Sequence, residues 1–267
     1  MSLLDRYYTD EHHMFRDAVR KFYEKEVTPN ADLWEKEGIV PRWVWKKAGE
    51  QGFLCPWLPE EYGGVNADFL YSFIMTEEMA KTRCSGFFIP LHSDIIVPYI
   101  NSYGTKEQKD RWLPGCVTGD IITAVAMTEP GTGSDLAAMR TTAVRDGDSF
   151  IINGQKTFIS NGLSCDLVIV AAVTDPNART PYEGMSLIVV EDGTPGFEKG
   201  RKLDKIGLHS QDTAEMAFVD CRVPAENLLG REGGGFYYLM EKLQQERLVC
   251  AMGSQVGAEE AFRVTLD

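Results

Sequence analysis

The spacing of apolar side chains changes twice along the chain, and this change constrains the fold more than any single motif. Over the first 120 of the 267 residues, apolar positions recur every three or four residues, as one face of an α-helix requires. From 121 to 231, short β-branched runs alternate with turn-forming dipeptides, and helical spacing then returns. We therefore predict an α+β fold: an N-terminal helical domain (1–120), a middle β-barrel or sandwich domain (121–231) and a helix over 232–267.

The helical part is predicted to contain five helices before residue 121. Four of them cover residues 10–27, 41–51, 68–82 and 93–103, and the fifth begins at Thr105. We expect Pro29 to end the first helix, because proline lacks the backbone N–H that a continuing helix needs. Gln108 follows Thr105 by three residues, a spacing typical of a capping box.

The middle part is predicted to be a set of short strands joined by tight turns. Asp146-Gly147-Asp148 and Asn153-Gly154 are both turn-forming sequences. The predicted strands cover residues 121–127, 141–144, 150–152, 157–159, 167–173, 185–190 and 214–219. Turns at this spacing favour a sandwich or a barrel.

The composition argues against several classes of protein. With 27 Lys and Arg against 40 Asp and Glu, the formal net charge is −13, which disfavours nonspecific nucleic-acid binding. The longest apolar runs are strand-sized, well short of the ~18 residues of a membrane-spanning helix. The six cysteines form no CxxC pair, and neither they nor the four histidines have metal-site spacing. We expect no metal ion, no nucleic-acid partner, no membrane span and a reducing compartment.

One loop concentrates glycines, hydroxyl residues and an acid. Thr128-Glu129-Pro130-Gly131-Thr132-Gly133-Ser134-Asp135 follows a predicted strand. Such a loop can direct successive backbone N–H groups at an anion, and glycine permits close approach. A plain surface turn is the alternative, because the loop lacks the P-loop lysine and the GxGxxG spacing.

A second candidate site follows at residues 156–162. Strand alternation places Phe158 and Ser160 on one face. An aromatic plane beside a hydroxyl can stack on and hydrogen-bond a planar heterocycle. The alternative is a core phenylalanine beside a turn.

The third candidate is Glu246, on the last predicted helix. At 100° per residue one apolar stripe of this helix contains Phe236, Leu239, Met240, Leu243 and Cys250. Glu246 and Arg247 lie on or beside that stripe. A carboxylate there loses water, which raises its pKa and suits it to act as a general base. Structural hydrogen bonding, or a place on the solvent edge, is the alternative for Glu246.

Several segments together resemble the acyl-CoA dehydrogenase family. Residues 126–138, AMTEPGTGSDLAA, match a signature of that family in full. INGQK (152–156) with ISNG (159–162), KIGLHS (205–210) with DTAE (212–215), and VPAENLLG (223–230) also resemble the family, in the same order. The resemblance covers almost the whole chain and agrees with the helix, β, helix pattern.

The resemblance implies a flavoprotein of fatty acid β-oxidation that converts a fatty acyl-CoA to the trans-2-enoyl-CoA. A base removes the α-proton, and the β-hydrogen leaves as hydride for N5 of FAD. The residues that correspond to the family's FAD site are Val125, Met127, Thr128, Gly133, Ser134, Phe158, Ile159 and Ser160. Phe158 and Ser160 replace the commoner tryptophan and threonine, which preserves an aromatic ring and a hydroxyl.

The resemblance also implies substrate-binding residues and a catalytic base. Ser134, Gln244, Gln245 and Arg247 are expected to border the acyl-CoA. Most family members place the base in the C-terminal helical domain. A minority, the long-chain and isovaleryl types, use a glutamate on the helix that follows the β domain, and Glu246 falls at that position. We expect Glu246 to be the catalytic residue.

Family members continue into a C-terminal four-helix bundle that completes the flavin pocket and forms the tetramer. Residues 232–267 are therefore expected to be the first helix of a truncated C-terminal helical domain. The resemblance implies a homo-oligomer (tetramer or dimer) in the full-length form, with an electron-transfer flavoprotein as electron acceptor. It also implies a location in the bacterial cytoplasm, or in the mitochondrial matrix for a mature eukaryotic form.

Two alternatives stay open at this stage. The first is an acyl-CoA oxidase or flavin monooxygenase of the same fold, which uses oxygen as acceptor. The second is a non-catalytic fragment or partner subunit, whose exposed last helix docks on another chain.

Overall fold

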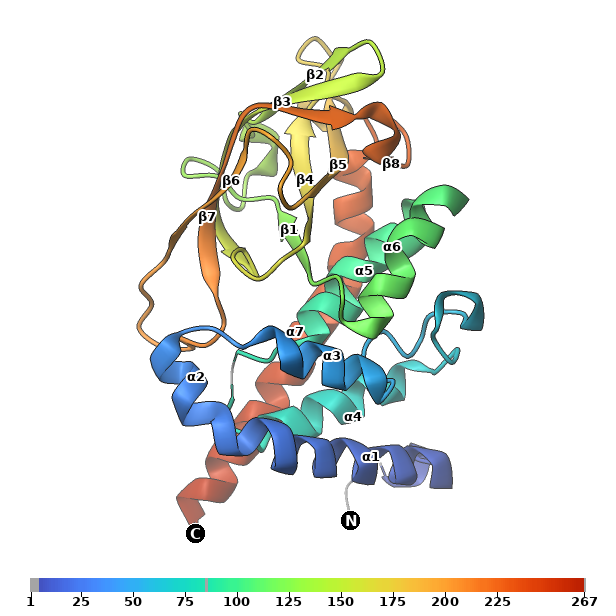
Figure 1. Cartoon of the computed structure of the whole chain (residues 1–267), viewed down its shortest axis with the longest axis vertical. Helices are drawn as coiled ribbons and strands as arrows, with labels where there is room; N and C mark the ends of the chain where they lie inside the picture. The colour runs from blue at the N-terminus through green and yellow to red at the C-terminus, as the bar shows by residue number, and fades with distance from the viewer. Residues whose placement is uncertain (1–4, 85, 267) are drawn as a thin grey trace.

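The computed structural model describes residues 5–84 and 86–266, and it contains three parts in the predicted order (Figure 1). Helices α1 to α6 come first, strands β1 to β8 form the middle part, and one long helix, α7, follows. In Figure 1 the strands lie above the helices, and α7 runs from the strands down past α4. The predicted α+β fold is confirmed.

Near Pro29 the first helix ends and a further short helix begins. α1 (Asp10–Phe22) passes into a π-helical turn (Tyr23–Val27) and a 3-10 turn (Thr28–Asn30), and α2 (Ala31–Glu37) follows. The first helix does end before Pro29, but α2 was not predicted. A proline in the first turn of a helical segment is tolerated, because its missing N–H has no internal partner there.

The other predicted helices are present. They are α3 (Arg42–Glu50), α4 (Phe69–Ala80), a π-helical turn (Leu91–Ile96) that leads into α5 (Val97–Tyr103), and α6 (Lys106–Thr118). The capping box of α6 is formed: Gln108 N donates to Thr105 Oγ1 at 3.3 Å, and Thr105 N donates to Gln108 Oε1 at 2.9 Å.

Eight strands form one sheet in the order β6-β7-β3-β2-β4-β5-β8, and β1 pairs with β4. The strands are β1 (Thr123–Ala126), β2 (Thr142–Asp146), β3 (Ser149–Ser160), β4 (Leu167–Val173), β5 (Met185–Glu191), β6 (Phe197–Lys202), β7 (Thr213–Pro224) and β8 (Leu228–Leu229). One residue pair, Thr142 with Val173, joins β2 to β4. Apolar residues of β3, β4 and β7 share one core, so the sheet folds over on itself.

The strand predictions fail at one turn and two strands. Asn153-Gly154 is not a turn but lies inside β3, at a bulge where the register against β7 shifts between Ile152 and Gly154. A Cβ on Gly154 would lie 2.4 Å from Thr141 Oγ1, so glycine is required by close approach. β6 and β8 were not predicted, because β6 is largely charged and β8 is two residues long.

Strands β4 and β5 are buried on both faces. Leu167, Ile169 and Ala171 of β4 pack in a core with residues of α5, α6 and α7. The alternating residues of β4, and part of β5, pack inside the folded sheet instead. The helices therefore cover one face of the β4–β5 pair, and the rest of the sheet covers the other.

His92 joins the helical part to the sheet. Its side chain is fully buried; Nε2 lies 3.0 Å from Cys116 O of α6, and Nδ1 lies 2.8 Å from Thr123 Oγ1 of β1. Nε2–H therefore donates to the carbonyl, and Nδ1 accepts from the hydroxyl. Burial lowers the pKa of His92 to about 4, so the ring is neutral at pH 7.

The last helix, α7 (Gly235–Leu266), is continuous over 32 residues. Leu239, Val249, Met252 and Val256 are buried, whereas Cys250 is exposed, so the predicted apolar stripe was wrong at Cys250. The buried face shifts around the helix because α7 packs first on β5 and α5 and then on α4. Asp267, the predicted end of this helix, lies outside the described residues.

Replacing Gly154 by alanine is expected to lower the free energy of unfolding by about 2 kcal/mol, because the new methyl group collides with the backbone and side chain of Thr141. Gly147→Ala is the matched control. Gly147 has a φ of +62°, and Gly154 has a φ of +156°, but a Cβ on Gly147 has nothing within 4 Å, so about 1 kcal/mol of backbone strain is expected there. Urea unfolding of both variants tests this, and an equal loss would contradict the close approach.

The unfolding free energy is expected to fall by about 3 kcal/mol as pH drops from 6.5 to 4 through His92 alone. The unfolded chain takes up a proton at His92 across this window, whereas the native chain does so only near pH 4. His92→Gln removes this part of the pH dependence, so its curve is flatter. His13→Gln, at an exposed histidine, is expected to keep the wild-type slope. Urea unfolding at several pH values measures both, and equal slopes in all three proteins would refute the assignment.

Candidate active site

Two of the candidate segments adjoin each other. Thr157 N donates to Thr128 O at 3.0 Å, and Thr128 Oγ1 donates to Thr157 O. Thr128 lies two residues beyond the end of β1 at Ala126. The two bonds bring the start of the 128–135 loop against the end of β3, so the loop and Phe158 belong to one region of the protein.

A buried ion pair fixes the base of this loop. Lys156 and Glu129 are 1% and 7% exposed, and Lys156 Nζ lies 3.0 Å from Glu129 Oε1 and 3.1 Å from Met127 O. Glu129 also accepts from the backbone N–H groups of Arg140 and Thr141. Burial lowers the pKa of Lys156 to about 8. Burial opposes ionisation of Glu129 too, but the bonds from Thr141 and the charge of Lys156 hold its pKa below the usual value.

Beyond this anchor the loop faces solvent. Gly131, Gly133 and Ser134 are exposed, and a Cβ on either glycine would meet nothing within 4 Å. Thr132 is buried, and its Oγ1 donates to Ala138 O at 3.1 Å. The loop therefore has a fixed base and an open rim, where backbone N–H groups and a hydroxyl can receive an anion.

Phe158 is an exposed aromatic residue with a strained backbone. Its side chain is 69% exposed, and its φ of +60° lies in the left-handed region. The register of β3 against β7 shifts between Lys156 and Ile159, and within this bulge Ile159 enters the core while Phe158 turns outward. Ser160 is half-buried. Phe158 is therefore not a core residue, and an exposed aromatic ring held at a strained position points to a function.

Glu246 lies half-buried on α7, where that helix packs on α5. Tyr99 Oη donates to Glu246 Oε1 at 2.6 Å, and the Tyr99 side chain is completely buried. Burial raises the pKa of Glu246, as expected from its place beside the apolar stripe, although the Tyr99 bond and the charge of Arg247 oppose the rise. The carboxylate therefore holds its proton more strongly than a solvated glutamate does.

The other predicted residues of α7 differ in their surroundings. Gln245 Nε2 donates to Asp94 O in the π-helical turn at 2.7 Å, which ties α7 to the helical domain. Gln244 and Arg247 are exposed. Gln245 thus has a structural contact, while its two neighbours are accessible to a ligand.

One apolar core connects the β1 candidates with the surroundings of Glu246. Val125 and Met127, at the end of β1, are partly buried against the core that contains Tyr99, Leu239 and Val249. The structure thus brings Val125, Met127 and the Glu246 region to one core. Gly133 and Ser134 lie further out, on the open rim.

Two features of this site were not predicted from the sequence. Tyr99 lies in the fourth predicted helix, and nothing local marks a contact with a residue 147 positions away. Glu129 and Lys156 both lie in segments that resemble the family. Two charged residues among apolar strands were therefore the sequence feature that could have indicated a buried ion pair.

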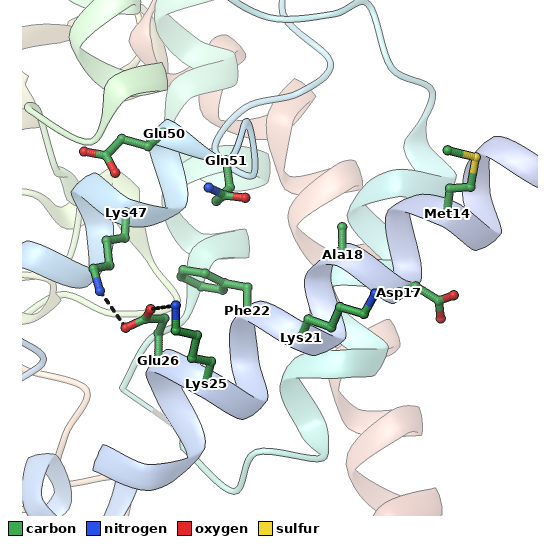
Figure 2. Close-up of a pocket in the computed structure, with 10 residues that line it drawn as sticks. All are labelled: Met14, Asp17, Ala18, Lys21, Phe22, Lys25, Glu26, Lys47, Glu50 and Gln51. Atoms are coloured by element: carbon green, nitrogen blue, oxygen red, sulfur yellow. Dashed lines mark hydrogen bonds and ion pairs between the residues drawn. The ribbon is translucent and has the colours of Figure 1, made fainter.

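A surface groove of about 690 Å³ lies elsewhere, between α1 and α3 (Figure 2). Glu26 pairs there with Lys47 at 2.7 Å and with Lys25 at 3.5 Å, as the dashed lines in Figure 2 show. Both signs of charge line the groove, and none of the predicted site residues does. The groove is separate from the candidate active site.

In residues 5–84 and 86–266, no group of three or more His, Cys, Asp or Glu side chains could hold a metal ion. None of the helices in the same ranges combines the length and the apolar character needed to cross a bilayer.

The fold and site define an α+β protein in which a helical domain, a folded sheet and a crossing helix hold an open glycine-rich loop and a desolvated carboxylate. Comparison with protein families identifies the class of protein. The family described as "Acyl-CoA dehydrogenase, N-terminal domain" matches residues 9–120, and "Acyl-CoA dehydrogenase, middle domain" matches residues 124–221. The chain belongs to the acyl-CoA dehydrogenase family.

Individual relatives agree with this assignment. The mitochondrial long-chain specific acyl-CoA dehydrogenase of Mus musculus is 52% identical over 260 residues, which are 97% of this chain and 60% of the mouse protein. The crystal structure of an acyl-CoA dehydrogenase from Geobacillus kaustophilus has a TM-score of 0.95 at 63% identity, over 97% of this chain and 68% of that chain. A glutaryl-CoA dehydrogenase from Mycobacterium smegmatis, solved in complex with FADH2, has a TM-score of 0.88 at 30% identity, over 98% and 66% of the two chains. The chain spans about 60% of the length of the mammalian long-chain relatives.

Replacing Glu129 by glutamine is expected to lower the free energy of unfolding by about 3 kcal/mol, because Lys156 is left as a buried charge without its counter-ion. Asp146→Asn is the matched control. It removes an exposed ion pair with Arg222 in the same sheet and is expected to cost less than about 1 kcal/mol. Urea unfolding at pH 7 compares the two variants. Similar losses of unfolding free energy would show that burial does not make the Glu129–Lys156 pair more important to stability than an exposed pair.

Proposed function

We propose that this chain carries the flavin and substrate residues of an enzyme that uses FAD to oxidise a fatty acyl-CoA to the trans-2-enoyl-CoA. The observation that carries the proposal is the position of Glu246. This carboxylate is half-buried, hydrogen-bonded and placed beside the apolar core that Val125 and Met127 also join. A desolvated carboxylate next to an apolar surface suits removal of a weakly acidic C–H proton from an apolar substrate.

The residues present fit FAD. Phe158 presents an exposed aromatic plane, as stacking on a planar ring system requires. The open loop rim offers backbone N–H groups without side-chain obstruction, as a pyrophosphate requires. The residues proposed to hold FAD are Val125, Met127, Thr128, Gly133, Ser134, Phe158, Ile159 and Ser160. Ile159 acts through its backbone, because its side chain lies in the core. FAD, when bound, supplies the hydride acceptor.

Glu246 is the proposed base for the α-proton. Its raised pKa makes it a stronger base than a solvated carboxylate, and the apolar residues around it keep water away from the reacting carbon. The α-carbon gives its proton to Glu246 and the β-carbon loses a hydride, so the substrate loses two hydrogens and gains a trans-2 double bond. Glu246 ends the step as a neutral carboxylic acid.

The remaining substrate residues are proposed to border the acyl-CoA ester. Ser134 and Arg247 are exposed and offer a hydroxyl and a cation to the anionic CoA part. Arg247 is needed in this role because the chain as a whole carries a net charge of −13. Gln244 is exposed beside them, and Gln245 fixes the wall of the site through Asp94.

Similarity to the mouse long-chain enzyme supports a fatty acyl-CoA as substrate class. We infer an electron-transfer flavoprotein as partner and a homo-oligomer, tetramer or dimer, for the full-length protein. A chain in the structure described as the electron transferring flavoprotein of Acidaminococcus fermentans is 38% identical to this one, with a TM-score of 0.89. Relatives in mitochondria and in bacteria support the mitochondrial matrix or the bacterial cytoplasm as the location.

An oxidase of the same fold is the second candidate. The prolyl acyl carrier protein oxidase AnaB shares the fold with a TM-score of 0.87 at 28% identity. Reoxidation of the substrate-reduced flavin by air separates the two. Slow reoxidation in air supports the dehydrogenase, and rapid reoxidation without an electron-transfer flavoprotein would assign the oxidase chemistry to this protein instead. A chain that binds no FAD would support the non-catalytic alternative.

Replacing Glu246 by glutamine in the FAD-loaded full-length protein is expected to slow flavin reduction by long-chain acyl-CoA at least about 100-fold, because the base is removed. The measurement is loss of flavin absorbance after anaerobic mixing. Glu241→Gln, an exposed glutamate on the same helix, is the control and is expected to react at the wild-type rate. A wild-type rate in Glu246→Gln would remove Glu246 from the mechanism.

A further inference from the structure

We propose that Tyr99 is a positioning residue for Glu246: its hydroxyl holds Oε1 of the carboxylate and leaves Oε2 directed at the α-carbon of the substrate. This inference rests on the proposed function, in which Glu246 is the base. Tyr99 acts through the carboxylate that it binds.

The donor is held rigidly. Tyr99 lies on the short helix α5, its side chain is completely buried, and its ring lies 6.3 Å from that of Tyr103 one turn later. The Oη to Oε1 distance of 2.6 Å is typical of a hydroxyl bonded to an ionised carboxylate. A buried ring with two torsion angles has little freedom to move, so the carboxylate is held at a defined point.

The acceptor helix is tied to the same part of the helical domain on both sides. Gln245 Nε2 donates to Asp94 O, five residues before Tyr99, at 2.7 Å. Lys242 Nζ donates to Ser102 Oγ, three residues after Tyr99, at 2.7 Å. The backbone that carries Glu246 is therefore fixed relative to the backbone that carries Tyr99. Of the three contacts, the one from Tyr99 reaches the carboxylate itself.

The charges around Glu246 make Tyr99 a permanent donor. Burial and the charge of Glu246 raise the pKa of Tyr99 far above its ordinary value, so the phenol stays protonated at any pH at which the protein works. Arg247, on α7, also acts on Glu246 through its charge. Asp94, in the π-helical turn, is fully buried and takes its hydrogen bond from Ser72 Oγ of α4 at 2.7 Å instead. Tyr99 and Arg247 therefore oppose the effect of burial on Glu246.

A held oxygen matters because proton abstraction depends on geometry. A glutamate side chain that can rotate presents either oxygen in many directions, and a misplacement of about 1 Å can cost about 100-fold in rate. With Oε1 occupied by a fixed donor, the carboxylate plane is set and Oε2 is the oxygen available to the substrate. The bond also stabilises the ionised form, which is the form that accepts the proton.

The first experiment measures Glu246 directly in protein labelled with ¹³C at the glutamate δ-carbon, followed by NMR against pH. Glu246→Gln identifies the signal. In Tyr99→Phe the pKa of Glu246 is expected to rise by about one unit, since a hydrogen bond to a charged group is lost. Tyr103→Phe is the matched control on the same helix and is expected to leave the Glu246 signal unchanged. Incorporation of 3-fluorotyrosine at residue 99, a stronger donor of nearly the same shape, is expected to lower the pKa.

The second experiment follows flavin reduction by acyl-CoA in the FAD-loaded full-length protein. Tyr99→Phe is expected to lower kcat about tenfold with KM little changed and to move the acid limb of the pH profile upward by the same one unit. Tyr103→Phe is expected to match the wild type in both. An unchanged Glu246 titration in Tyr99→Phe, or an equal shift in Tyr103→Phe, would overturn the positioning role.

These experiments distinguish failure of the proposed function from failure of the positioning role of Tyr99. If Glu246→Gln reduces flavin at the wild-type rate, the proposed function fails, whereas an NMR shift in Tyr99→Phe still establishes the contact. If Glu246→Gln is inactive but Tyr99→Phe keeps the wild-type titration and kcat, Glu246 remains the base and Tyr99 has no part in its action.

Discussion

Strands β4 and β5 carry apolar side chains on both faces, and neither face is stable in water. One face packs against α5, α6 and α7, and the other packs inside the folded sheet. The pair of strands is thus buried between a helical domain on one face and a second layer of strands on the other. Along the chain, helices come before this pair of strands, and α7 returns to it afterwards.

The same packing places the candidate active site at a junction. β1 lies beside β4 and is joined to the helices by His92, so its end at Ala126 emerges where the helical core meets the sheet. The loop that leaves this end is fixed by the buried Glu129–Lys156 pair. α7 packs on the helical part and brings Glu246 to Tyr99 at the edge of the core. Rigid elements therefore hold the edges of the site, and the accessible residues lie between them.

Local sequence patterns predicted the elements that are determined by residues close together in the sequence. The run over residues 167–173 corresponds to β4 at both ends, because seven consecutive apolar residues leave no alternative to a buried strand of that length. The Thr105–Gln108 capping box formed because both partners lie within one turn. Asn153-Gly154 failed as a turn, because the glycine is required by the close approach of Thr141, which lies just before β2. Tyr99 could not be found at all, since its role depends on a contact across 147 residues.

Comparison of two carboxyl groups shows why burial alone does not define a base. Asp94 is 3% exposed with Ser72 as its donor, and burial raises its pKa to about 7, but no substrate can reach it. Glu246 has a similar hydroxyl donor in Tyr99, yet it is half-buried and has the charge of Arg247 beside it. Partial burial strengthens the base, while the Tyr99 donor and the Arg247 cation oppose the rise in its pKa. The useful position for a base is therefore the edge of an apolar core, where desolvation and access coexist, and α7 brings Glu246 to that edge.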